Sequence, residues 1–145
     1  MAYEIQVTPD LNYVDTAIGI KLPMIGRNGV LFDVSYSTVD QALSNFKNLI
    51  LTRRGERIMQ PLFGTDIYNS IFELDHDDLT EHLKYEIIEA TGFWLPYIQV
   101  RSCDVKATTS DVGYGFNIST QIAVDNYIVP TPITFTITSN GISTT

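Results

Sequence analysis

The segment "LTRRGER", residues 51–57, places three arginines and one glutamate around Gly55. Guanidinium groups donate hydrogen bonds to phosphate, carboxylate and carbonyl oxygens. The segment could therefore bind nucleic acid, form part of a catalytic site, or dock against another protein. Neighbouring cations favour the charged form of Glu56, whereas the acid of a glycosidase must carry a proton. The arginines thus argue against catalysis by Glu56 and leave the two binding roles open.

The acidic run "ELDHDD", residues 73–78, has the side chains of a metal site but not the spacing. An EF-hand loop starting at Asp75 needs an oxygen ligand at its fifth position and glycine at its sixth, where this chain has leucine and threonine. His76 and His82 are six residues apart and would fall on different faces of a helix. Acidic residues at a helix start simply complement its dipole, so we expect no bound metal or other cofactor.

Motifs for nucleophilic catalysis or phosphate binding are weak. The chain has no nucleophile elbow, and Cys103 lies among charged neighbours in a predicted strand. Gly113 and Gly115 form a lone GxG with no helix after it, which is more typical of a turn or bulge than of a phosphate-binding loop. We therefore predict that the chain is not an enzyme.

Composition narrows the choice of partner. The chain has 145 residues and a net charge of −8, and 44% of its residues are hydrophobic, which suits one domain with its own core. An acidic surface repels phosphate, so we expect no nucleic-acid partner. We expect no membrane contact, because no run approaches about 20 apolar residues. The single cysteine and the lack of a signal sequence indicate a reducing, intracellular compartment.

Three helices are predicted to position the arginines. The first spans about residues 38–54, with Gly55 ending it and with Arg53 and Arg54 in its last turn. A short second helix is expected after a cap at Thr65 or Asp66. The third is stopped by Pro96 and carries an inner apolar stripe: Leu79, Leu83, Ile87, Ala90 and Trp94. A solvent-facing helix end is the other interpretation of the basic cluster.

The rest of the chain predicts strands. Residues 98–108, 114–129 and 133–139 are rich in β-branched and aromatic residues, and their short connections favour antiparallel pairing. Residues 56–61 could form a brief strand. Residues 1–36 are predicted to be an N-terminal extension with one strand at 30–36, preceding a domain at 37–145. The fold class is therefore α+β, with about three helices packed on a mainly antiparallel sheet.

The stretch from Asn48 to Glu73 resembles the gene 25-like family of baseplate wedge proteins from contractile-tailed phages. The family pattern is a helix ending in Leu-Thr-basic-basic-Gly-Glu-Arg, then Pro-x-Phe-Gly-Thr, then a short helix ending in Phe-Glu. This chain has these elements at residues 51–57, 61–65 and 72–73. Residues 18–42 also resemble versions from marine phages of the T-even type, and the resemblance covers roughly residues 17–138.

The resemblance implies a structural protein of the virion tail baseplate, assembled in the host cytoplasm and present in six copies. Its single domain would be similar to the handshake part of the tail sheath protein. The implied partners are the sheath and the larger baseplate wedge proteins, with the tail tube or hub as a further one. An edge of the sheet would pair with sheath extensions and so template sheath assembly. Strands near residues 116–124 and 133–138 are the candidate edges.

The segment after the first helix is therefore interpreted as a docking corner. We expect its arginines to meet acidic or carbonyl groups on partner subunits, with Glu56 tying one arginine in place. Many members have Glu-Pro-Arg after the third helix, but this chain has Leu95-Pro96-Tyr97, so only Pro96 is carried over. The candidate docking residues are Arg53, Arg54, Gly55, Glu56, Arg57, Pro61, Phe63, Gly64 and Pro96.

Two alternatives stay open. Some members of the family carry a lysozyme label, so a baseplate-associated lysozyme (muramidase) is the alternative function, although no residue noted above supports it. A small adaptor protein unrelated to phages is the other.

Overall fold

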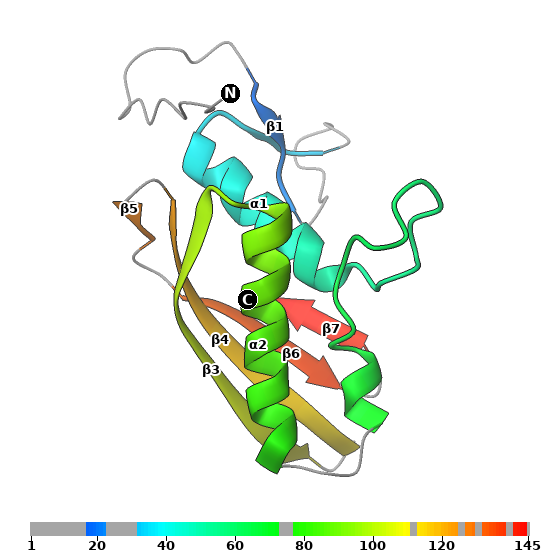
Figure 1. The fold of residues 1–145 in the computed structure, drawn as a ribbon. Coiled ribbons are helices and arrows are strands. Elements are labelled where there is room, and N and C mark those ends of the chain that lie inside the picture. The colour runs from blue at the N-terminus through cyan, green and yellow to red at the C-terminus, as the bar shows by residue number, and fades with distance from the viewer. Residues whose placement is uncertain are drawn as a thin grey trace. The chain divides into compact units, whose positions relative to one another are not determined.

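The computed structural model describes residues 17–22, 32–72, 77–110, 113–124, 127–129, 132–138 and 141–144 (Figure 1). The chain divides into two compact units, residues 1–48 and 49–145, and the boundary lies within the first helix. The predicted division between residues 36 and 37 stays a prediction. None of the described helices is both long and apolar enough to span a membrane.

The first unit contains a small antiparallel ladder and most of α1 (Thr38–Leu51). Strands β1 (Gly19–Ile20) and β2 (Val34–Ser35) pair with Gly19 opposite Ser35. Of the strand predicted at 30–36, residues 30 and 31 lie outside the described residues, and only Val34 and Ser35 of the others are in a strand, β2. Strand β1 was not predicted. Gln41 links the ladder to the helix, because its side chain accepts from Ser35 Oγ and donates to Asn45 Oδ1 at 2.9 Å.

The second unit is built on a five-stranded antiparallel sheet. Its main order is β3 (Ile98–Ser110), β4 (Gly113–Val124), β6 (Ile133–Thr138), β7 (Gly141–Thr144), and β5 (Tyr127–Ile128) pairs with β4. Alternation in β6 is as predicted, with Ile133, Phe135 and Ile137 buried. The predicted strand 114–129 is divided into β4 and β5, and β7 was not predicted. The α+β class with a mainly antiparallel sheet is confirmed.

Helix α2 (Asp77–Trp94) covers one face of the sheet (Figure 1). Four of the five residues in its predicted inner stripe are at most 6% exposed: Leu79, Leu83, Ile87 and Ala90. The fifth, Trp94, is half-buried. The helix ends before Pro96, where Leu95 N still donates to Thr91 O at 2.8 Å. Proline has no N–H to continue this pattern.

The prediction of about three helices is wrong, because the described residues contain two α-helices and one 3₁₀ turn, η1 (Asn69–Phe72). The predicted second helix is replaced by turns and η1. Thr65 is held in a parallel bridge to Arg53, which keeps its backbone extended and leaves little room for a helix. Asn69 and Ser70 also have modest helix propensity.

Two local predictions near the arginines are also wrong. Helix α1 ends at Leu51, so Arg53 and Arg54 lie beyond its last turn. Arg54 N instead donates to Thr65 O at 3.2 Å, outside the helical pattern. Residues 56–61 form turns rather than a brief strand.

Among the described strands, the free edges of the sheet lie at β3 and β7, the two ends of the main order. The expectation of an edge at residues 116–124 or 133–138 is wrong, because these residues form β4 and β6. Strand β4 pairs with β3 and β6, and β6 pairs with β4 and β7. Sequence periodicity indicates which residues face the core but not the order of strands in the sheet.

Candidate docking site

The segment between α1 and η1 is a closed loop, called here the docking loop (residues 52–65). Its two ends are joined by backbone hydrogen bonds, from Thr65 N to Thr52 O at 2.9 Å and from Arg54 N to Thr65 O at 3.2 Å. The buried Thr65 hydroxyl adds a third bond by donating to Ile50 O at 3.1 Å. The loop therefore starts and ends at one fixed point beside the end of α1.

The interior of the loop has its own hydrogen bonds. Gly55 N donates to Pro61 O at 2.7 Å, and Phe63 N donates to Gln60 O at 3.1 Å. Two predicted site residues, Gly55 and Gly64, have φ of +89° and +111°. Side chains with a Cβ rarely adopt these values, so glycine is required by conformation at both positions.

Gly64 is further restricted by space, since a Cβ there would overlap the Thr52 carbonyl oxygen, whereas a Cβ on Gly55 would meet nothing within 4 Å.

Two of the arginines lie over aromatic rings of the same chain. The Arg53 guanidinium is 3.3 Å from the centroid of Tyr68, and that of Arg57 is 4.1 Å from the centroid of Phe63. Such cation–π contacts contribute roughly 0.5–1 kcal/mol at exposed sites. Glu56 accepts from the backbone N–H of Arg53 at 3.1 Å. The carboxylate thus closes a turn and holds Arg53 through its backbone.

Arg54 joins a buried carboxylate that the sequence analysis did not single out. Its guanidinium lies 3.2 Å from Asp66 Oδ2 and 3.9 Å from Glu86 Oε1. Glu86 is 8% exposed, and its Oε1 accepts from Asp66 N. The other oxygen, Oε2, is buried without a hydrogen-bond partner among the described residues. Burial raises the pKa of Glu86, while the Asp66 amide and Arg54 oppose that rise.

A sequence signal for Glu86 existed. It follows Leu79 by seven residues and Leu83 by three, which places it on the inner face of α2. A carboxylate on an apolar stripe predicts a buried partner. The partners of Glu86 are Arg54 and Asp66, which are 32 and 20 residues away in the sequence. Local sequence patterns therefore could not identify them.

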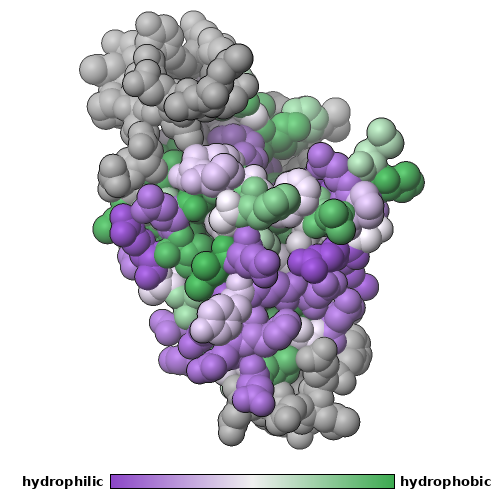
Figure 2. Space-filling model, in the orientation of Figure 1, coloured by the Kyte–Doolittle hydropathy of each residue, from purple (hydrophilic) through white to green (hydrophobic). Residues whose placement is uncertain are grey.

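The tip of the docking loop is apolar and exposed. Ile58 is 96% exposed, Met59 92% and Leu62 71%. Figure 2 shows this tip as a green projection at the upper right, beyond the purple surface around it. The sequence does not identify these residues as site candidates, and residues 56–61, which include Ile58 and Met59, are predicted to form a brief strand. A run of apolar residues between two loop glycines was the available signal.

Phe63 connects the loop to the end of α2. It is 9% exposed, and its ring packs edge-on against Trp94 with centroids 5.2 Å apart. Phe93, which is 74% exposed, packs edge-on against the same Trp94 ring, with their centroids 5.0 Å apart. Pro61 and Pro96 are both exposed, in the loop and in the turn after α2. Phe63 and Trp94 thus bring together the two regions that contain the predicted docking residues.

Metal ligands, a thiol and the Gly113–Gly115 pair are the groups that the sequence suggested for chemistry. The described residues contain no group of three or more metal-ligating side chains. Burial raises the pKa of the Cys103 thiol, which favours its neutral, unreactive form. Gly113 and Gly115 lie inside β4 and not at a helix start. A groove lined by Arg54, Leu62, Glu89, Ala90, Phe93 and Trp94 has a volume of about 170 Å³. Ligand pockets are usually about 300–1,000 Å³, so the groove suits a protruding side chain better than a saccharide.

Comparison with known proteins gives one family and six chains of similar fold, among them the following two. Residues 33–127 match the family described as baseplate wedge protein gp25. A Geobacter sulfurreducens protein named as a tail lysozyme is 22% identical, with a TM-score of 0.55 over 78% of this chain and 94% of that chain. A chain of the anti-feeding prophage baseplate is 18% identical, with a TM-score of 0.62 over 74% of this chain and 84% of that one. No curated protein matches in sequence.

At these identities the two solved structures support the fold alone. The family match extends from β2 to β5 and includes the docking loop, α2 and the paired strands β3 and β4. It therefore spans well over half of the chain, and it includes the motif at residues 51–57, 61–65 and 72–73. The chain belongs to the family of the baseplate wedge protein gp25.

Proposed function

We propose that this chain is a structural subunit of a contractile-tail baseplate that joins the larger wedge proteins to the first ring of the tail sheath. The observation that carries the proposal is the family match over residues 33–127, which includes the docking loop. The anti-feeding prophage baseplate contains a similar fold and supports the same setting. The proposed location is the virion tail, with assembly in the host cytoplasm, six copies per baseplate, and the tube or hub as a further neighbour.

The docking corner is part of this proposal. Within it, Gly55, Pro61 and Gly64 shape the loop, and Phe63 fixes it to α2. The arginines and Glu56 hold the loop by contacts within the chain. The arginines are also exposed, and the proposal keeps their role of meeting acidic or carbonyl groups on partner subunits. Pro96 sets the turn that follows α2.

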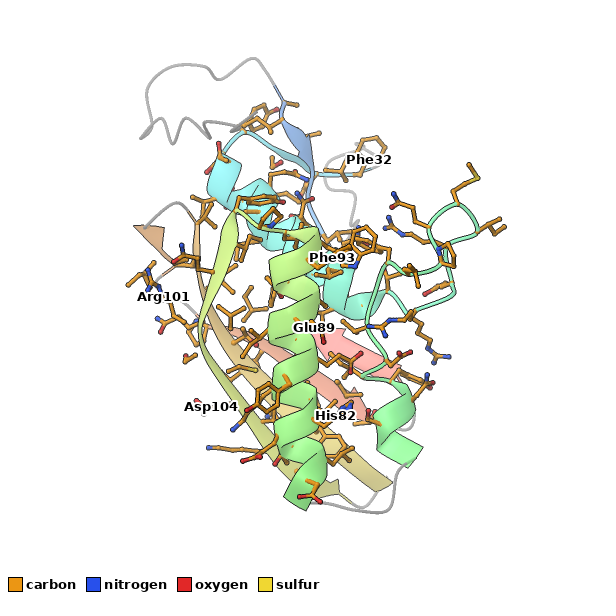
Figure 3. All side chains as sticks on the ribbon, viewed as in Figure 1. Phe32, His82, Glu89, Phe93, Arg101 and Asp104 are labelled. Carbon is orange, nitrogen blue, oxygen red and sulfur yellow. The ribbon has the colours of Figure 1, made fainter. Side chains whose placement is uncertain are left out.

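The sheath contact is proposed to use strand addition at β7. An unpaired strand edge offers backbone donors and acceptors to an incoming strand. The edge of β3 has features that block such addition, namely a register shift after Val100 and exposed charges at Arg101, Asp104 and Lys106. Figure 3 shows Arg101 and Asp104 projecting outward from β3. The sequence of β7, Gly-Ile-Ser-Thr, contains no charged residue, so β7 is the more permissive edge.

Photocrosslinking can distinguish the two edges. We expect benzoylphenylalanine at Thr144 to form an adduct with the sheath protein in assembled particles, because a strand paired with β7 lies about 5 Å away. The same group at Lys106 serves as the matched control on β3 and should give no sheath adduct. A sheath adduct at residue 106 and none at residue 144 would contradict the assignment of the edge.

The name of the Geobacter protein makes a lysozyme the second candidate function. Glu86 is the one described carboxyl group whose pKa is clearly raised, as a glycosidase acid requires. However, it is 8% exposed and lies behind the Asp66 amide and Arg54. A sugar chain could not reach it without displacing these groups. The geometry therefore favours the structural role.

A further inference from the structure

The ladder of β1 and β2 in the first unit extends beyond its two paired positions. Ile18 N donates to Ser35 O at 2.8 Å, and Lys21 N donates to Asp33 O at 2.9 Å. The two segments therefore run side by side as extended chains. Side chains along each of them alternate between the two sides of the ladder.

One side of the ladder makes polar contacts with α1. A Cβ on Gly19 would overlap the side chain of Gln41, and the buried Ser35 hydroxyl donates to the same side chain. Lys21, two positions after Gly19, forms an ion pair of 3.1 Å with Asp40. The side of the ladder that faces the helix is thus held by hydrogen bonds and charge.

The other side of the ladder is apolar and exposed. Ile20 lies directly opposite Val34. Each further member lies two positions from one of this pair and so shares its side. The ladder face is defined as these five residues: Ile18, Ile20, Phe32, Val34 and Tyr36. Val34 is half-buried and the other four are between 39% and 53% exposed, and Figure 3 shows the Phe32 ring projecting outward from the ladder.

This arrangement reverses the usual one. An antiparallel sheet normally packs its apolar side on the rest of the protein and turns its polar side to water. A ladder of only two strands is also marginal in stability unless its apolar side is covered. Gathered exposed apolar side chains are typical of contact sites, whereas single ones are ordinary. We therefore expect another segment to cover the ladder face.

The size of the ladder face limits what can cover it. A stable complex between separate proteins uses about 20–30 residues on each side, several times more than the ladder face contains. A second copy is further disfavoured, because each chain carries a net charge of −8. A segment of the same chain needs less contact, since its tether raises its effective concentration at the face.

A segment with a suitable pattern precedes β1 in the sequence. Residues 3–7 lie outside the described residues, and their sequence, Tyr-Glu-Ile-Gln-Val, alternates between apolar and polar side chains. Residues 8–17 connect this segment to the ladder and can span about 33 Å, whereas a ladder of about five residues is about 17 Å long. The segment can therefore reach every part of the ladder face.

We propose that residues 3–7, called here the cover segment, pack across the ladder face of the same chain. Tyr3, Ile5 and Val7 face the ladder, and Glu4 and Gln6 face water. This packing removes apolar surface of both segments from water, and the polar side of the cover segment restores a polar exterior.

Methyl NMR on the full chain, with the isoleucine δ1 groups labelled, tests this contact. Tyr3→Ser combined with Ile5→Ser removes an aromatic ring and an aliphatic side chain from the proposed contact. The signals of Ile18 and Ile20 should therefore shift. The signal of Ile137, which is fully buried in β6, should stay in place and report an intact fold.

Glu4→Ser combined with Gln6→Ser is the matched control, because it changes two adjacent positions on the polar side of the cover segment. Its effect on the Ile18 and Ile20 signals should be about a fifth of that of the first pair, since no ring or methyl group leaves the ladder face. Equal shifts from the two pairs, or no shift from either, would overturn the proposal.

Disulfide trapping on a Cys103→Ser chain gives a second measurement. Ile5→Cys combined with Ile20→Cys should form a disulfide within one chain about fivefold faster than Gln6→Cys combined with Ile20→Cys, because only the first pair points its Cβ atoms at each other. Equal rates would contradict the proposed side of the cover segment. Disulfides formed mainly between two chains would overturn the proposal in favour of a second copy. Ile18 and Ile20 signals that shift only on addition of a separate tail protein would overturn it in favour of a partner.

Discussion

Gly64→Ala is expected to lower the free energy of unfolding by about 3 kcal/mol, more than any other single loop substitution. Two costs add at this position. A φ of +111° is strained for alanine, and the new Cβ would overlap the carbonyl oxygen of Thr52. That carbonyl accepts the Thr65 N–H bond that closes the docking loop, so relief of the overlap would open the loop.

Gly55→Ala is the matched control. Its φ is also positive, but a Cβ there would meet nothing within 4 Å. Only the conformational cost remains, and the expected loss is about 1 kcal/mol. Urea unfolding followed by circular dichroism measures both values. Equal losses for the two variants would show that the backbone of residue 64 is not held against Thr52.

Glu86→Ala is expected to cost about 2–4 kcal/mol of stability, because it removes a buried acceptor and leaves its partners unpaired. The Asp66 N–H would lose its acceptor, and Arg54 would lose one of its two carboxylates. Glu86→Gln keeps an acceptor at the same place without the charge. It should therefore cost less than half as much in the same urea experiment.

The pH dependence of Glu86 has a definite sign. Burial raises its pKa in the folded chain above the usual value of 4.5, so the folded state binds the proton more tightly than the unfolded state does. The contribution of Glu86 to the free energy of unfolding is most favourable below pH 4.5. It is lost as the pH rises through the higher pKa of the folded state. Relative to Glu86→Gln, the unaltered chain should thus lose stability as pH rises from 4.5 toward neutrality. A relative gain over that range would contradict the buried position of Glu86.

The elements that follow from local periodicity could be predicted. Leu83 and Ile87 are fully buried on α2, and Phe135 is fully buried on β6, because helical and alternating spacing each mark one face. The α+β class follows from the order of these patterns. Gly55 and Gly64 could also be predicted to lie in a loop, although the sequence does not reveal that residue 64 lies against Thr52.

The parts that depend on tertiary contacts could not be predicted. The sequence shows three cations around Gly55, but their partners Tyr68, Phe63 and Glu86 come from other turns and from α2. The end of α1 at Leu51 is likewise set by Thr65, which takes the backbone bonds that a longer helix would have used. Which strands lie at the edges depends on β7, a segment of four residues with no clear pattern of its own.

The most direct test of the baseplate assignment is cross-linking mass spectrometry on purified, assembled contractile-tail particles whose genes include the gene for this chain. Lys47 and Lys106 are half-exposed and exposed, and they lie on α1 and β3, so they sample separate regions. The account predicts the chain in the particles, with cross-links from these lysines to other baseplate proteins or to the sheath. Particles that assemble and contract without the chain, while the purified chain clears peptidoglycan in a zymogram, would contradict it.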